Sequence, residues 1–151
     1  MLLYTHYVAD SDVAHDRTDD DMSSAPQLLA VNYSRAWADR DPDSIIEMHT
    51  DDSVFHLHNV ADPVSGRVAI RQAIASLFAQ SPDLSFVHRR IFFGTEHFVS
   101  EYEMNGTADA KSFACDGVDV FSLRDGRIAR KDTYIDWLTY QSQVGRMPSF
   151  A

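Results

Sequence analysis

The sequence contains little cysteine, little positive charge and no long hydrophobic run. Its 151 residues include one cysteine, Cys115, so neither an intrachain disulfide framework nor a cysteine-rich zinc site can form. Thirteen Lys and Arg residues stand against 23 Asp and Glu residues, and the net charge of -10 would repel nucleic acid and anionic membranes. No stretch approaches the roughly 18 apolar residues of a membrane span, and aspartates interrupt the N-terminal segment before an export signal forms. We therefore expect a cytoplasmic protein that partners neither nucleic acid nor membrane.

The chain does contain enough apolar material for one core, since 44% of its residues are hydrophobic and 11% are aromatic. Residues 1–24 carry six aspartates and one strong base, Arg17, which predicts an acidic, disordered arm. Alternatively, the apolar residues of this arm pack on a neighbouring subunit: Leu2, Leu3, Tyr4, Tyr7 and Val8. We expect a single domain over residues 25–146 and a short tail at 147–151.

Helical patterns occupy the first half of the expected domain. Apolar spacing predicts helices over 25–39 and 66–80, and Asp41 followed by Pro42 predicts a short helix between them. The residues that recur at i, i+4, i+7 and i+8 are Leu29, Tyr33, Ala36, Trp37, Ile70, Ile74, Leu77 and Phe78.

Residues that favour β-structure dominate the remaining segments. They predict strands over 53–58, 84–93, 97–104, 113–123 and 127–137. Asp136 is expected to cap a last segment at 137–144. Helices first, followed by strands that short turns connect, predict an α+β fold with an antiparallel sheet.

Asp125 and Gly126 form the clearest turn signal, and the type of turn decides which charges face each other. A two-residue turn would place Asp119 opposite Asp132, whereas a three-residue loop with a bulge would place Asp119 opposite Lys131. Unlike charges across a strand pair stabilise it and like charges destabilise it, by a few tenths to about 1 kcal/mol. We therefore prefer the second register.

Three features together resemble the SnoaL-like branch of the nuclear transport factor 2-like superfamily. They are the helix-helix-strand-helix-sheet order, the run Gly117-Val118-Asp119-Val120-Phe121 with Asp125-Gly126-Arg127-Ile128, and the run Asp132-Thr133-Tyr134-Ile135-Asp136. The resemblance covers about residues 26–145. It implies a cone-shaped, barrel-like α+β domain, in which a curved antiparallel sheet and three helices enclose a mostly apolar pocket, and often a dimer built on the outer face of the sheet. The superfamily includes isomerases, hydrolases, dehydratases, cyclases and non-catalytic binders, so the resemblance identifies no reaction.

The steroid isomerases of this superfamily offer a partial match. Tyr33 and Asp119 stand where those enzymes have the tyrosine and the protonated acid that donate to the substrate oxyanion. Leu57 replaces their general-base aspartate and cannot move a proton. The resemblance thus implies an oxyanion hole without its usual base, unless a bulge brings His56 or His58 inward. Our own hypothesis is that a histidine such as His58, or Lys131, moves the proton.

Two other chemistries of the superfamily match less well. The positions of the limonene epoxide hydrolase site carry Phe55, Leu57, Tyr102, Met104 and Thr133, which excludes that mechanism. Cyclase-like members need a group that abstracts a proton next to a carbonyl, and Asp119 is the acid that we place on the pocket face. Without a nearby cation Asp119 would be a protonated donor or a base, whereas beside Lys131 it would be an ionised partner.

An apolar lining is expected around Asp119. Its members are Trp37, Phe55, Leu57, Phe78, Tyr102, Met104, Cys115, Phe121 and Thr133. This lining suits a small apolar molecule, even a polycyclic one. The alternative is that the same side chains simply fill the core, and Cys115 is expected to be inert packing in either case.

His56 and His58 share one strand face, a geometry that can present two imidazoles to a metal. The sequence identifies no third ligand, since His88 and His97 belong to other predicted strands. Alternation with the expected lining residues turns the pair away from the pocket, toward solvent or a dimer partner. We expect no metal and no cofactor.

Two functions follow from these patterns. The first is a cofactor-independent isomerase, lyase or cyclase that stabilises an enolate, and the second is a non-catalytic protein that binds an apolar metabolite. We also expect a homodimer, formed through the sheet face that carries Val54, His56, Val118 and Val120.

Overall fold

The computed structural model describes residues 25–147, which form four helices and six strands. The predicted arm and residues 148–151 of the predicted tail lie outside the described residues. In chain order the elements are α1 (Ala25–Ala38), α2 (Pro42–Glu47), β1 (His49–Leu57), β2 (Val64–Ser65), α3 (Arg67–Gln80), β3 (Ser85–Phe93), β4 (His97–Ala108), β5 (Lys111–Arg124), β6 (Arg127–Ile135) and α4 (Trp137–Val144). The predicted helices and long strands are confirmed, while β2 was not predicted.

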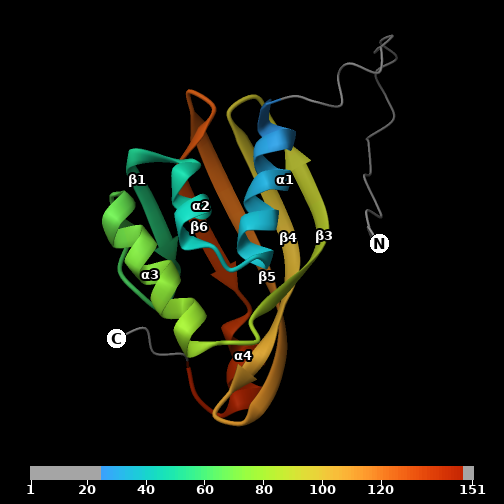
Figure 1. Ribbon diagram of the computed structural model, residues 1–151. Helices are drawn as coiled ribbons and strands as arrows, with labels where there is room; N and C mark the ends of the chain where they lie inside the picture. The colour runs from blue at the N-terminus through green and yellow to red at the C-terminus, as the bar shows by residue number, and fades with distance from the viewer. Residues whose placement is uncertain (1–24, 148–151) are drawn as a thin grey trace, which may run out of the picture.

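The strands form one curved sheet in the order β2-β1-β6-β5-β4-β3, and α1, α2 and α3 cover one of its faces (Figure 1). The long β4–β5 hairpin extends beyond these helices, and α4 packs on β5 at that end (Figure 1). This is the expected α+β cone. The expectation of a wholly antiparallel sheet is wrong at one place, because β1 and β6 pair in parallel. Strands so far apart in the chain have no hairpin between them to impose an antiparallel direction.

Capping side chains define the ends of two helices. The Asp41 carboxylate accepts hydrogen bonds from the backbone N–H groups of Asp43 and Ser44 and so starts α2. Asp136 accepts one from the N–H of Thr139 and caps α4, as predicted. Gly145, at a φ of 94°, ends α4 in the left-handed conformation that favours glycine.

The turn between β5 and β6 corrects the predicted register. Asp125 and Gly126 both have positive φ, so they form a two-residue turn between Arg124 and Arg127. An irregularity then shifts the pairing by one residue, because Ser122 faces Arg130 while Leu123 faces Ile128. Neither predicted alternative accounts for both features together. Asp119 consequently faces Thr133, and the preferred pairing of Asp119 directly opposite Lys131 is wrong.

The core consists of two groups of buried side chains. The larger lies between the helices and the sheet: Ala30, Tyr33, Ala36, Trp37, Ile45, Ile46, Ile70, Ile74, Phe78, Phe98, Phe121 and Ile128. The smaller lies near α4: Leu84, Phe113, Cys115, Trp137, Tyr140 and Val144. Within residues 25–147, no helix combines the length and the apolar character that crossing a membrane requires.

Candidate functional site

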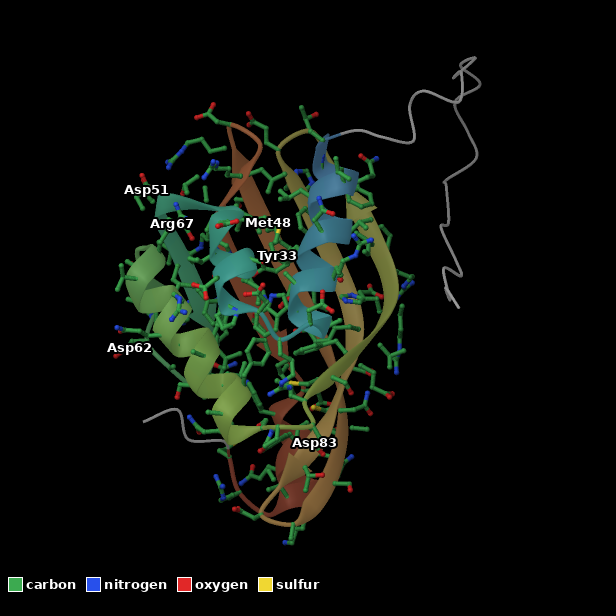
Figure 2. All side chains as sticks on the ribbon, viewed as in Figure 1. Tyr33, Met48, Asp51, Asp62, Arg67 and Asp83 are labelled. Atoms are coloured by element: carbon green, nitrogen blue, oxygen red, sulfur yellow. The ribbon has the colours of Figure 1, made fainter. Side chains whose placement is uncertain are left out.

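Polar residues of the predicted site meet on the helix-covered face of the sheet. Thr133 of β6 lies directly opposite Asp119 of β5, and Lys131 lies two residues along on the same face. Tyr33 of α1 lies over the middle of the sheet (Figure 2). All four side chains are buried. The structure therefore brings Tyr33, Asp119 and Lys131 together, as the sequence predicted, although by a different register.

Asp119 is surrounded by hydrogen-bond donors. Its Oδ1 accepts from the Tyr102 hydroxyl at 3.0 Å and from the Thr133 hydroxyl at 2.7 Å. Its Oδ2 lies 3.0 Å from Lys131 Nζ. The Lys131 ammonium has no lone pair, so it can only donate to Oδ2, and its positive charge favours a carboxylate as its partner. The geometry therefore makes Asp119 an ionised partner of Lys131, in place of the protonated oxyanion donor that the isomerase resemblance implied.

Lys131 lies inside a group of aromatic rings. Its Nζ is 4.5–5.5 Å from the ring centroids of Tyr33, Trp37, Phe55 and Phe121, within the range of cation–π attraction. Burial lowers the pKa of this ammonium, but the Asp119 charge raises it, and the net direction is upward. Lys131 is therefore a cationic hydrogen-bond donor, and the predicted use of Lys131 as a base does not fit this state.

Lys131 and its neighbour Trp37 have N–H groups that donate no hydrogen bond in the described part of the chain. An ammonium has three N–H bonds, and among residues 25–147 Asp119 is the one hydrogen-bond partner that Lys131 has. The indole Nε1 of Trp37 is buried and makes no hydrogen bond of normal geometry within the same part of the chain, although it lies close enough to the Tyr33 hydroxyl to lower the pKa of that tyrosine. Buried donors normally have partners, so two underused donors in one place suggest a site for an oxygen atom of a ligand.

Sequence reasoning missed a histidine that orients Tyr33. The Tyr33 hydroxyl lies 3.2 Å from His49 Nε2, and His49 Nδ1 lies 2.7 Å from the Ser53 hydroxyl. Burial lowers the pKa of His49 to about 3, with a further contribution from the Lys131 charge, so the imidazole is neutral. Burial also raises the pKa of Tyr33. His49 was missed because β1 begins four residues before the predicted strand.

The predicted lining residues divide between the two core groups. Trp37, Phe55 and Phe121 surround Lys131, and Phe78 packs edge-on against Trp37. Cys115 is buried in the smaller core group near α4, and Leu57 and Met104 pack against that group. Burial raises the pKa of the Cys115 thiol to about 11, which fits inert packing.

An open hollow lies elsewhere, at the start of α3. It encloses about 640 Å³ and is lined by Asp51, Ser65, Gly66, Arg67, Val68, Ala69 and Gln72. Asp51 and Arg67 mark this region in Figure 2. The hollow shares no residue with the predicted lining, whose side chains around Lys131 are packed against one another.

His56 and His58 lie on the opposite face of the sheet from Asp119. His56 faces Asp132, the neighbour of Lys131 in sequence, and His58 Nε2 lies 2.8 Å from the Asp132 carboxylate. The pair faces away from the Lys131 group, as alternation predicted. The suggestion that a bulge turns His58 inward as a base is wrong for this geometry.

Comparison with known proteins identifies the family to which the chain belongs. The family model of the SnoaL-like domain matches residues 30–131, and the chain belongs to this family. No curated protein matches the chain.

Solved structures show the same fold. TerC, co-crystallized with polyporic acid, is 15% identical and superposes with a TM-score of 0.72, over 82% of this chain and 100% of TerC. A protein from Catenulispora acidiphila DSM 44928, with a ketosteroid isomerase-like fold and in complex with trimethylamine, is 17% identical with a TM-score of 0.71, over 80% of this chain and 93% of that one. A candidate SnoaL-like polyketide cyclase from Jannaschia sp. CCS1 is 17% identical with a TM-score of 0.71, over 89% of this chain and 100% of that one. At these identities the likeness is one of fold.

Proposed function

We propose that this protein binds a small, mostly apolar molecule that has a carbonyl or oxyanion oxygen, and that the Lys131 ammonium donates a hydrogen bond to this oxygen. The observation that carries the proposal is the buried Lys131 ammonium, which has one carboxylate partner and four aromatic rings around it. The unpartnered indole N–H of Trp37 supplies a second donor beside it. The rings pack against one another in this structure, so they would have to separate to provide apolar contact for the rest of the molecule.

The same arrangement supports enolate chemistry. When a base removes a proton from the carbon next to a carbonyl, negative charge develops on the carbonyl oxygen, and a preorganised ammonium stabilises that charge. Asp119 holds Lys131 in position, while Tyr33 is engaged with His49. Lys131 and Trp37 would thus form the oxyanion site, in place of the pair Tyr33 and Asp119.

His88 is the candidate proton carrier for this catalytic version of the function. Its Nδ1 lies 3.0 Å from the Ser100 hydroxyl, and Ser100 faces Asp119 across the β4–β5 pair. Burial of part of the ring lowers the pKa of His88, so its imidazole is neutral and able to accept a proton. Without such a base, the protein would be a binder that does no chemistry.

Two structural relatives support a small-molecule function. TerC was co-crystallized with polyporic acid, and the Catenulispora acidiphila protein is in complex with trimethylamine. A SnoaL-like domain that receives a small molecule is therefore consistent with its fold relatives.

The binding proposal is tested with 4-nitrophenol, whose absorption reports the phenolate form. The wild-type protein is expected to bind the phenolate in preference to the neutral phenol. The double variant Lys131→Met/Asp119→Asn is expected to lose this preference; Asp119→Asn is included because Lys131→Met alone would leave a buried carboxylate unpaired. Lys111→Met is the matched control, since it removes the one other lysine, which bonds the Val144 carbonyl far from the site. Equal phenolate binding by all three proteins would contradict the proposal.

We also infer a homodimer through the outer face of the sheet. Val118 pairs with Tyr134 across the β5–β6 ladder, Val120 lies two residues along β5, and Phe92 of β3 lies beyond Val99 in the row of Val120. Phe92 and Tyr134 are large side chains that are about half exposed, at 49% and 46%. Sedimentation velocity is expected to show a dimer that Val118→Lys dissociates. A wild-type monomer at all concentrations would contradict this inference.

A further inference from the structure

A second cluster of chemically active side chains lies on the outer face of the sheet. His56 and His58 are two residues apart on β1, so both imidazoles lie on this face. Asp132 of β6 pairs directly with His56 across the parallel β1–β6 ladder. Two imidazoles and one carboxylate thus meet at a place that the sequence could not reveal, since 74 residues separate His58 from Asp132.

The three side chains lie at the distances that a shared metal ion requires. His58 Nε2 lies 2.8 Å and His56 Nδ1 3.8 Å from the same oxygen, Asp132 Oδ1. One ligand atom from each residue falls within 4.8 Å of the others. Ligands about 2.1 Å from a tetrahedral zinc ion are separated by about 3.4 Å, between the two distances found here. The His56 and His58 rings lie 3.7 Å apart between centroids, so both imidazoles would have to rotate to direct their nitrogens at one ion.

Neighbouring residues hold this arrangement in place. Arg130 donates two hydrogen bonds to Asp132, from Nε to Oδ2 at 2.6 Å and from a terminal nitrogen to Oδ1 at 2.7 Å. The His58 ring stacks on Tyr134 with 4.1 Å between centroids, and Trp137 donates to the His58 carbonyl. Such supporting contacts orient the ligands of established metal sites.

We propose that His56, His58 and Asp132 bind a zinc ion on the outer face of the sheet, with the fourth coordination position open. Two nitrogens and one carboxylate oxygen form a ligand set that zinc accepts, whereas magnesium and calcium prefer oxygen alone. Asp132 would bind the ion through Oδ1, where the ion would displace the hydrogen bond from the Arg130 terminal nitrogen, and Oδ2 would keep the bond from Arg130 Nε. The Arg130 side chain is 42% exposed, so solvent screens its charge. His58 would carry its proton on Nδ1 and present the Nε2 lone pair to the metal.

This zinc site is independent of the proposed ligand at Lys131. Side chains of Lys131 and Asp132 leave opposite faces of β6, so each proposal can fail without the other. In the monomer the imidazole and carboxylate side chains of the cluster remain 16–24% exposed and accessible to an ion. The homodimer inferred above would use the same face, since Tyr134 stacks on His58, so zinc binding is expected of the monomer.

The experiment is a zinc titration of the metal-free full-length chain, in competition with a chromophoric chelator. We expect one ion per chain. Variants His56→Gln, His58→Gln and Asp132→Asn should each weaken binding at least about tenfold, since loss of even a supporting residue has that effect at known sites. Cobalt in place of zinc should give the visible absorption of a four-coordinate ion, and His56→Gln should remove it.

Histidines outside the cluster provide the controls. His97→Gln removes an exposed imidazole on β4, and the double variant His6→Gln/His15→Gln removes two near the N-terminus. Both are expected to bind zinc as the wild type does. If zinc affinity is the same in wild type and in the three cluster variants, or falls only in a control, the site is wrong. Because His56 is partly exposed, its substitution keeps the test valid even where Asp132→Asn lowers stability.

Discussion

The two faces of the sheet use the same kinds of side chain in different surroundings. On the helix-covered face, Asp119 and Lys131 are 7% and 5% exposed and lie among aromatic rings. On the outer face, the adjacent residue Asp132 pairs with Arg130 and His58, which remain partly exposed. Neighbours in the sequence therefore belong to sites of opposite character.

Burial explains what each ion pair can do. A charge on the covered face has lost its water, so it depends on its partner, and a ligand oxygen would meet an ammonium that solvent does not screen. Charges on the outer face are screened and retain exchangeable partners, which suits an ion or a second subunit. The ion pair on the inner face thus affects the free energy of unfolding and the charge of a bound ligand most strongly, whereas the outer face can bind an ion or another subunit.

The largest expected effect is a difference in stability between variants of Asp119 and Asp132. Asp119→Ala leaves Lys131 buried without its counter-charge and should lower the free energy of unfolding by about 3–5 kcal/mol. Asp132→Ala removes a partly exposed pair and should cost about 1 kcal/mol or less. Urea denaturation measures both. Equal losses in the two variants would show that burial does not distinguish the faces. The double variant Asp119→Leu/Lys131→Met should recover most of the stability that Asp119→Ala loses, because it removes both charges.

A smaller effect is expected from two tyrosine hydroxyls. Tyr33→Phe leaves the buried Nε2 of His49 without its partner and should cost about 1–3 kcal/mol. Tyr134→Phe on the outer face should change stability by less than about 0.5 kcal/mol, since that residue is exposed. Thermal and urea unfolding of the two variants compare them directly. A similar loss in both would contradict the assigned burial of the Tyr33–His49 bond.

Acid should destabilise the protein through His49. Burial lowers the pKa of His49 from 6.5 to about 3 in the folded protein. Between these values the unfolded chain binds more protons, so stability falls as the pH drops below about 6.5, by up to about 1.4 kcal/mol per pH unit. Urea denaturation between pH 7 and pH 4.5 should give a shallower slope for His49→Gln than for the wild type. Identical slopes would mean that His49 takes up its proton without unfolding.

The smallest effect is expected from removing residues 1–23. Their acidic composition predicts a change in the free energy of unfolding below about 0.5 kcal/mol. Melting and sedimentation of the truncated chain test this. A clear loss of dimer would instead indicate that the apolar residues of the arm cover a face of the sheet in a partner subunit.

Local sequence patterns were sufficient for much of the fold. The apolar spacing of α1 and α3, the caps Asp41 and Asp136 and the β-favouring segments each depend on residues close together in the chain. Alternation along β5 also placed Asp119 on the inner face of the sheet, and the motif around it indicated the SnoaL-like family that the family model matches. These inferences needed no knowledge of distant contacts.

The contacts that make the two sites were decided by tertiary structure. One residue of β6, between Ile128 and Arg130, has no partner on β5, which shifts the pairing of the two strands by one position. Thr133 therefore faces Asp119, while Lys131 still reaches the Asp119 carboxylate diagonally. The parallel pairing of β1 with β6 brought Asp132 to His56. A sequence pattern reports the face of a strand, because side chains alternate locally, but the register between strands depends on the packing of the whole sheet.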